Sequence, residues 1–222
     1  MTSEFPRSPR LLKGSLVVFE TKLPVPTNMI VFQYNPDAMT RNFQQQTGPQ
    51  NAWFSAGDSA HVTGPPTETF QITVELDAAD QLEAPRSNPL TVASGLHPAL
   101  SALELLLYPP STMLILNKVL AFAGSAMVTP PEVPLVLFVW GPARVVPVRI
   151  TAVSITEQAF DQRLNPILAK VELGMRSLTE KELKQAGAPF DTLALVRQIT
   201  KEALARANVA NAAQQIRGIL PF

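Results

Sequence analysis

Cysteine is absent from the 222 residues of the sequence, and histidine occurs only twice. The absence of cysteine excludes disulfide bonds, thiolate metal ligands and a cysteine nucleophile. Two histidines leave few side chains that change protonation near neutral pH. A chain of this length buries roughly 70% of the surface that it exposes when unfolded, so we expect a core that is stable without cross-links.

Charge is also scarce. Charged residues make up 16% of the sequence, and 18 Lys and Arg residues balance 18 Asp and Glu residues. Proteins that bind nucleic acid normally carry a basic excess that neutralises phosphates, so nucleic acid is not an expected partner. Hydrophobic residues reach 46%. In a chain with so little charge, this proportion indicates that part of the surface is buried in an assembly.

Two segments bear on targeting and on membranes. The first residues, 1–14, lack the apolar run of about 7–15 residues that marks a secretory signal, so we expect the chain to act in the cytoplasm. The apolar segment Thr112–Val128 is at the short limit for crossing a bilayer, and Asn117 and Lys118 lie in its middle. We expect this segment to be buried or covered by a partner, with membrane contact as the alternative.

Alternating apolar residues predict a β-rich body. The clearest strand is Glu68–Asp77, in which every second residue is apolar. In the long run Arg144–Glu157 the apolar residues change from even to odd positions. This change predicts a bulge near Ala152, or a second face that meets another subunit. The other predicted strands are Ser15–Glu20, Asn28–Asn35, Met39–Gln46, Ile167–Leu178 and the fully buried Pro134–Trp140.

Helical patterns occur at two places. His97–Tyr108 has Pro98 in its first turn and leucines on one face, which predicts a short helix packed on the sheet. Leu193–Gln215 carries an apolar stripe typical of a longer helix. Residues 47–67 and 78–96 show little periodicity and are predicted to be loops. The expected organisation is a flexible arm (1–13), a β domain (14–180) with an insert at about 109–133, and a helical extension (181–222).

Catalytic motifs were not found in the sequence. It has no glycine-rich phosphate loop, no His-Glu-x-x-His and no Gly-x-Ser-x-Gly. Two ligands cannot hold a metal ion alone, so a nearby pair of polar residues is interpreted as solvated. We therefore expect no catalytic residue, metal ligand or cofactor. This interpretation covers Asp58 with His61 and Glu157 with Asp161. His97 is expected to have a polar capping role at a helix start, and Glu104 is expected on the polar face of its helix.

Several motifs, taken together, point to a family. Residues 13–46 contain the VFQYNP motif at Val31–Pro36 and a following Thr40-Arg41 pair. Further motifs are HPALSALELLLYP at residues 97–109 and the long strand-rich stretch at residues 134–180. In this order they resemble the tube proteins of contractile injection systems, which are phage-tail-like particles. The resemblance covers roughly residues 13–180.

The resemblance implies a β-rich α+β fold of the phage-tail-tube type. Two antiparallel sheets would form a barrel or sandwich flanked by one short helix, and six copies would close into a ring. The chain is most similar to the larger baseplate subunits that join the inner tube to the central spike. Its implied partners are further copies of itself, the inner tube protein, the spike protein and other baseplate components. In that subgroup a LysM domain often follows, but residues 181–222 are too short and too helical for one.

The candidate interface residues come from the strands and from the tail. The three arginines could form ion pairs between subunits or could simply solvate a strand face, and both interpretations stay open. The apolar residues would meet another subunit through the second face of the long strand and through the tail stripe. The complete set is Arg41, Arg144, Arg149, Val153, Ile155, Leu193, Val196 and Ile199.

Two other functions remain as alternatives. An ordinary inner tube subunit would be a shorter chain, so the insert and the tail argue against it. A small enzyme such as a peptidoglycan hydrolase would need paired carboxylates or a nucleophile with its base, and the sequence shows neither motif.

Overall fold

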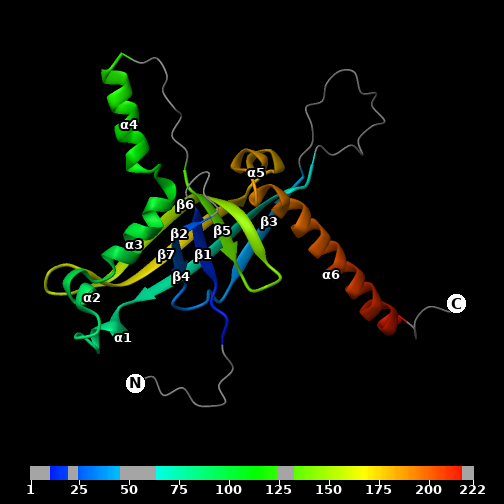
Figure 1. The fold of residues 1–222 in the computed structure, drawn as a ribbon. Helices are drawn as coiled ribbons and strands as arrows, with labels where there is room; N and C mark the ends of the chain where they lie inside the picture. The colour runs from blue at the N-terminus through cyan, green and yellow to red at the C-terminus, as the bar shows by residue number, and fades with distance from the viewer. Residues whose placement is uncertain (1–10, 20–24, 46–63, 125–132, 217–222) are drawn as a thin grey trace.

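Seven antiparallel strands form one continuous sheet in the computed structural model (Figure 1). The structure describes residues 11–19, 25–45, 64–124 and 133–216, with only the backbone of residues 210–216. The strand order is β2-β1-β5-β6-β7-β4-β3. The strands are β1 (Ser15–Phe19), β2 (Pro26–Val31), β3 (Met39–Gln44), β4 (Thr67–Asp77), β5 (Leu135–Val139), β6 (Val145–Phe160) and β7 (Pro166–Ser177).

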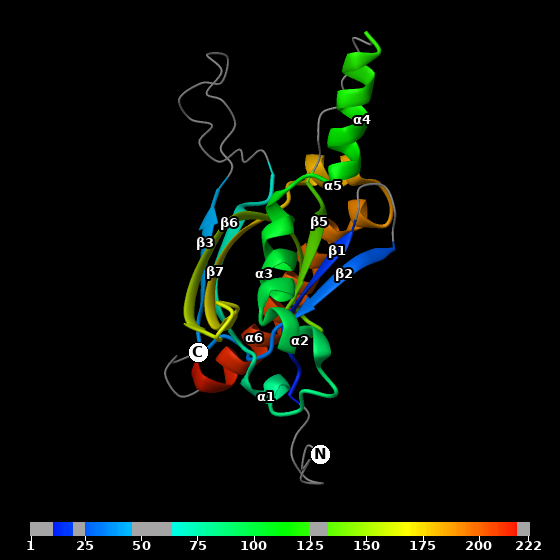
Figure 2. The ribbon, with the colours of Figure 1, turned by 90° about the vertical axis from the view of Figure 1, so that its left-hand side faces the viewer.

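The expectation of two separate sheets is wrong for the described residues. β1 pairs with both β2 and β5, and β6 pairs with both β5 and β7, so the pairing runs without a break. The single sheet is instead strongly curved. Figure 2 shows β1, β2 and β5 on one side of helix α3 (His97–Glu104), with β3, β6 and β7 on the other. The broader prediction of a mixed α+β chain is confirmed.

The main core lies between α3 and the face of the sheet that curves around it. β4 alternates as predicted: Phe70, Ile72 and Val74 are each at most 3% exposed and lie on the core face. Leu100 and Leu103 of α3 pack into the same cluster. A fully buried β5 was predicted, and this is wrong for Leu137 and Val139. These two residues stay half-buried because they point to the opposite face of the sheet.

The predicted bulge is confirmed. β6 has 16 residues, and its register with β7 shifts between Ile150 and Ala152. An extra residue on one strand reverses which side chains face the core beyond that point. This reversal explains why Val146, Val148 and Ile150 face the core before the shift, and why odd-numbered residues do so after it.

The described residues contain five α-helices besides α3. They also contain two short 3₁₀ turns, η1 (Leu105–Leu107) and η2 (Phe190–Thr192). The region 78–96 was predicted to be a loop, and this is wrong because it contains α1 and α2. Helices this short hold too few turns to show a 3.6-residue period. The five helices are α1 (Ala79–Leu82), α2 (Pro89–Ser94), α4 (Ser111–Phe122), α5 (Glu180–Ala186) and α6 (Leu193–Ile216).

Gly95 ends α2 at a point where the backbone approaches the β6–β7 turn. Its φ is +55°, and an added Cβ would lie 2.4 Å from the carbonyl oxygen of Pro166. The N–H of Leu96 donates to that same oxygen at 2.8 Å. Only glycine combines this conformation with so close an approach.

The connector from β2 to β3 joins the two edge strands of the sheet. β2 ends at Val31, earlier than the predicted strand end at Asn35, and the Phe32 side chain that follows is 1% exposed in the main core. The side-chain amide of Gln33 then forms two hydrogen bonds with the backbone of Asp77, at the end of β4. It donates to the Asp77 carbonyl at 2.8 Å and accepts from the Asp77 N–H at 2.9 Å.

A capping box begins α5. The Thr179 hydroxyl accepts from the N–H of Glu182, and the Glu182 carboxylate accepts from the N–H of Thr179 at 2.8 Å. Arg176 of β7 donates two hydrogen bonds to the same carboxylate, at 2.8 and 3.0 Å. The hydrogen bonds from Arg176 lower the pKa of Glu182 from 4.5 to about 2, even though burial opposes them.

This lowered pKa predicts an acid-sensitive contribution to stability. Because folding favours the ionised Glu182, its contribution is complete above pH 4.5 and is lost as the pH falls from 4.5 towards about 2. The difference in unfolding free energy between wild type and Glu182→Gln should therefore shrink across this range. Urea titrations at several pH values would measure it, and a difference that is constant with pH would contradict the assignment.

The described helices include none that is long and apolar enough by itself to span a membrane. One bent pair of helices, His97–Leu107 followed by Ser111–Phe122, together has the length and apolar composition of a membrane span, with an angle of 52° between its halves. The predicted arm (1–13) and the predicted loop (47–67) lie largely outside the described residues.

Candidate functional site

A buried carboxylate marks the most unusual site in the described structure. Glu68 is the second residue of β4, and alternation along the strand places it on the same face as Phe70. Its side chain is 2% exposed. A buried carboxylate is costly unless it is paired and hydrogen-bonded, so its partners define the site.

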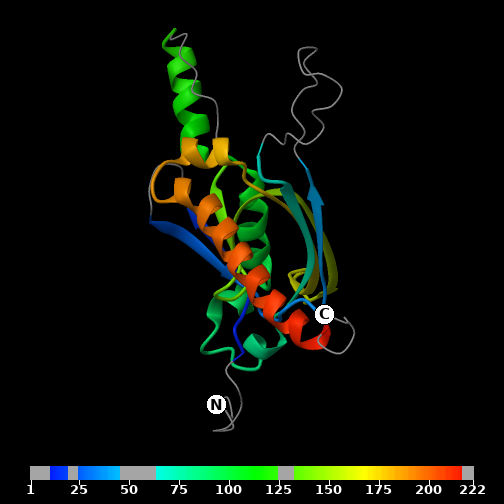
Figure 3. The same ribbon diagram turned by 90° about the vertical axis from the view of Figure 1, so that its right-hand side faces the viewer.

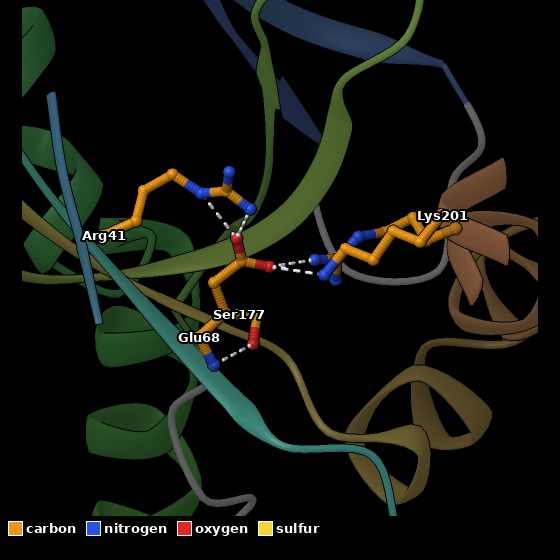
Figure 4. Close-up of polar contacts among 5 residues, drawn as sticks. Arg41, Glu68, Ser177 and Lys201 are labelled. Atoms are coloured by element: carbon orange, nitrogen blue, oxygen red, sulfur yellow. Dashed lines mark hydrogen bonds and ion pairs between the residues drawn. The ribbon is translucent and has the colours of Figure 1, made fainter. Parts of the chain in front are cut away.

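Three cations surround Glu68 (Figure 4), and together we call these four residues the Glu68 cluster. Arg41 of β3 donates to Oε1 through Nε at 2.8 Å and also through Nη2. Arg197 and Lys201 of α6 approach the other oxygen, Oε2, at 2.6 and 3.1 Å. The backbone N–H of Glu68 donates to the Ser177 hydroxyl at 3.0 Å. Both carboxylate oxygens are therefore bonded to cations from opposite sides.

The strand register brings Arg41 to this position. Arg41 lies opposite Phe70 and Phe43 lies opposite Glu68 in the β3–β4 pair, so all four side chains share one face. The Arg41 guanidinium lies 5.1 Å from the Phe43 ring centre and 5.8 Å from that of Phe70. Lys201 lies 5.2 Å from the Phe43 ring centre. The aromatic rings thus provide cation–π contacts to two of the three cations.

The electrostatics of the cluster are dominated by the cations. Burial raises the pKa of Glu68, but hydrogen bonds from Arg41 and Lys201 outweigh it, so the pKa is lower than usual. Burial lowers the pKa of Arg197 and of Arg144, and repulsion from Arg41 lowers both further. Arg144 therefore belongs to the same electrostatic environment, although it lies on the β5–β6 connection.

A cavity of about 450 Å³ opens beside the cluster. We call it the basic cavity because of the cations in its wall. Its described charged residues are Glu68 and four cations, namely Arg41, Arg144, Arg197 and Lys201. The larger apolar residues of its wall are Trp140, Val145, Val146, Leu193, Val196 and Leu204.

The tail is attached to the sheet by a second, apolar contact. Phe190 of η2 and Leu183 of α5 pack with Phe19 and Leu135 on the face of the sheet opposite the main core. The rings of Phe190 and Phe19 meet edge to face, with centres 5.0 Å apart. From there α6 crosses the side of the molecule seen in Figure 3. Residues 201–209 of α6 are all exposed.

Helix α4 projects from the body of the molecule (Figures 1 and 2). It has no buried residue, although it is strongly apolar. Of the two expectations for Thr112–Val128, burial within its own chain is wrong for the described part, residues 112–124, and cover by a partner stays a prediction. Its exposed apolar side chains include Leu114 (42%), Ile115 (60%), Leu116 (52%), Val119 (59%) and Phe122 (97%).

The structure divides the eight predicted interface residues into groups. Arg41 and Arg144 line the basic cavity, whereas Arg149 faces Glu182 at 3.8 Å. Val153 and Ile155 are half-buried and pack against the main core of their own chain.

The three predicted residues of the tail lie at the beginning of α6. Leu193 is half-buried and packs against the apolar contact that includes Phe190 and Phe19. Val196 and Ile199 are 53% and 55% exposed. The first turns of the tail helix therefore contact the sheet on one side while presenting apolar side chains to the surroundings on another.

Sequence reasoning missed Glu68, Arg197 and Lys201. The signal for Glu68 was present, because it is the only charged residue on the otherwise apolar face of β4. Arg197 and Lys201 are four residues apart and thus lie on one face of a helix. Their spacing alone could not identify the carboxylate that they bind, which is more than 120 residues away in sequence.

The other polar residues considered in the sequence do not assemble into a site within the described residues. Glu104 and Glu157 are exposed, and His97 begins α3. Asp161 stabilises the β6–β7 turn by accepting from the N–H groups of Arg163 and Asn165. Asp58 and His61 lie outside the described residues. Within the described residues, no group of three or more His, Cys, Asp or Glu side chains is placed to hold a metal ion.

Comparison with known proteins provides no family. No protein-family model matches the sequence, and no curated protein matches it significantly. The exposed apolar helices, the two sheet edges and the strand motifs are therefore the features from which a function can be inferred.

Proposed function

We propose that the chain is a structural subunit of a contractile injection system baseplate. Copies of it, six in the simplest arrangement, would form a ring that joins the inner tube to the central spike and starts tube assembly. The observation that supports this proposal most is α4, an apolar helix with no buried residue. An apolar surface of this kind is typical of a protein–protein contact.

The sheet supports the same proposal. Its edge strands are β2 and β3, each paired on one side only among the described residues. Met29 and Val31 of β2 and Phe43 of β3 are at least half exposed. Exposed edges favour pairing with another chain. A head-to-tail contact between two different surfaces closes into a ring when the rotation between copies is suitable.

The direct test is to locate the subunit in particles purified from the native producer. An epitope tag on this chain, visualised by electron microscopy, should label one end of the particle at the junction of tube and spike. Label along the whole tube would instead support the alternative of an ordinary tube subunit. Particles that lack the label altogether would contradict both assignments.

A variant of α4 tests the contact itself. Ile115→Asp should leave the free energy of unfolding within about 0.5 kcal/mol of wild type, because this exposed side chain packs on no core. The same change should abolish ring formation, measured by mass and by electron microscopy. This variant separates assembly from folding better than Val153→Asp or Ile155→Asp, because those two substitutions would also disturb the core of the monomer.

Thr112→Asp provides the matched control. Thr112 is exposed in the first turn of the same helix, where a negative charge favours the helix dipole. It should form rings normally. Normal rings from Ile115→Asp would show that α4 is not a subunit contact.

A further inference from the structure

The basic cavity carries more positive charge than its own residues neutralise. Its described wall contains four cations and one carboxylate. Both oxygens of that carboxylate, in Glu68, are already engaged by Arg41, Arg197 and Lys201. Arg144 adds a fourth positive charge to the same wall. The described wall therefore has an excess of three positive charges.

Such an excess is unfavourable when the groups are partly removed from water. The Arg197 side chain is 18% exposed and that of Arg41 is 29% exposed. Burial lowers the pKa of Arg197 and of Arg144, repulsion from Arg41 lowers both further, and attraction to Glu68 does not fully compensate. An anion in the cavity would relieve this repulsion.

The rest of the wall defines what the anion must be attached to. Trp140 and the α6 residues Leu193, Val196 and Leu204 supply apolar surface in the same wall as the cations. A volume of about 450 Å³ lies within the range of sites that bind small molecules, which combine an apolar lining with a few polar groups. The guanidinium groups of arginine match the geometry of carboxylates and phosphates.

We propose that the basic cavity binds a small molecule with an oxyanion group, a carboxylate or a phosphate, on an apolar or aromatic body. The oxyanion lies against Arg144 and the outer sides of Arg41, Arg197 and Lys201. The apolar body lies against Trp140 and the first turns of α6. The argument for this site does not rest on the proposed structural role, because it uses only the charges and the lining of a cavity within one chain.

The tryptophan in the wall allows a direct measurement. The sequence has two tryptophans, Trp53 and Trp140, so a Trp53→Phe background leaves Trp140 as the only indole. Its fluorescence should change saturably when phenyl phosphate or phenylacetate is added at constant ionic strength. Phenol, which lacks the oxyanion, should give no saturable change. Binding of phenyl phosphate alone would assign the site to phosphates, and binding of phenylacetate alone would assign it to carboxylates.

Arg144→Gln tests the role of the excess charge. Among the described residues, the ion pairs of Glu68 are with Arg41, Arg197 and Lys201 and not with Arg144, so the loss of Arg144 should leave the Glu68 cluster intact and the protein folded. The dissociation constant for the bound probe should rise by about tenfold or more, as expected for the loss of a charged hydrogen bond. Arg86→Gln, an exposed arginine in the α1–α2 connection, should leave it unchanged. If Arg144→Gln does not fold, Lys201→Gln is the second variant: it removes another cation from the cavity, its side chain is 50% exposed, and Arg41 and Arg197 still bind Glu68.

Two results would overturn the proposal. One is the absence of a saturable change with either probe up to the millimolar range in the folded Trp53→Phe protein. The other is an equal weakening by Arg144→Gln and Arg86→Gln, which would show that the probes respond to overall charge and not to this cavity.

Discussion

Replacing Glu68 with alanine is expected to lower the free energy of unfolding by about 3–5 kcal/mol. The carboxylate is 2% exposed and is the shared partner of Arg41, Arg197 and Lys201. Its removal leaves three cations close together without the anion that neutralises them. Urea unfolding measures the loss as a lower midpoint concentration, provided that wild type and variant have the same slope of unfolding free energy against urea concentration.

Two further variants identify the cause of that loss. Glu68→Gln keeps the shape and the acceptor oxygen but removes the charge, so its effect should lie between wild type and Glu68→Ala. Glu75→Ala breaks an ion pair with Lys170 in which both side chains are about half exposed, and it should cost at most about 1 kcal/mol. Similar losses for Glu68→Ala and Glu75→Ala would mean that the buried cluster has no special role in stability.

The apolar attachment of the tail should be equally important. Phe190 is 5% exposed and packs against Phe19 and Leu183 on the outer face of the sheet. Phe190→Ala is expected to cost about 3–5 kcal/mol, because it removes a buried aromatic side chain and leaves a cavity. Since this contact holds the beginning of the tail, α6 should also become more sensitive to proteolysis. Trypsin digestion followed by mass spectrometry would detect faster cleavage at Lys201 and Arg206.

Phe122→Ala is the matched control for this substitution. Phe122 ends α4 and is 97% exposed, so the same change should alter the stability of the monomer by no more than about 0.5 kcal/mol. If Phe190→Ala leaves the cleavage of α6 as slow as in wild type, the ionic contacts to Glu68 are sufficient to hold the tail.

The strands were predictable because their side chains repeat every two residues. β4 and β7 follow this period with one face against the core, and the change of phase in β6 correctly predicted its bulge near Ala152. The short helices α1 and α2 were not predictable, because their four and six residues are too few to establish a period. The capping box at Thr179 and Glu182 was a local signal that the sequence did contain.

Long-range arrangement was harder to predict than local structure. Apolar residues in Thr112–Val128 suggested burial, yet α4 extends away from the body, because composition alone does not say which surface will cover a helix. Arg41 and Arg144 were identified as candidates, but their common position beside Glu68 depends on strand register and on the path of α6. These are contacts between distant parts of the chain, and the local patterns of a single sequence do not reveal which distant residues will meet.

The amide of Gln33 has a consequence for how the sheet can move. It forms the pair of hydrogen bonds with Asp77 that a neighbouring backbone would otherwise form. The connector between the two edge strands is thereby tied to the end of β4, next to β3. Opening the curved sheet at this end would break both bonds at once, so its two borders should flex together. A load applied to one border would reach the other through the connector backbone, which the Gln33 side chain holds against the end of β4.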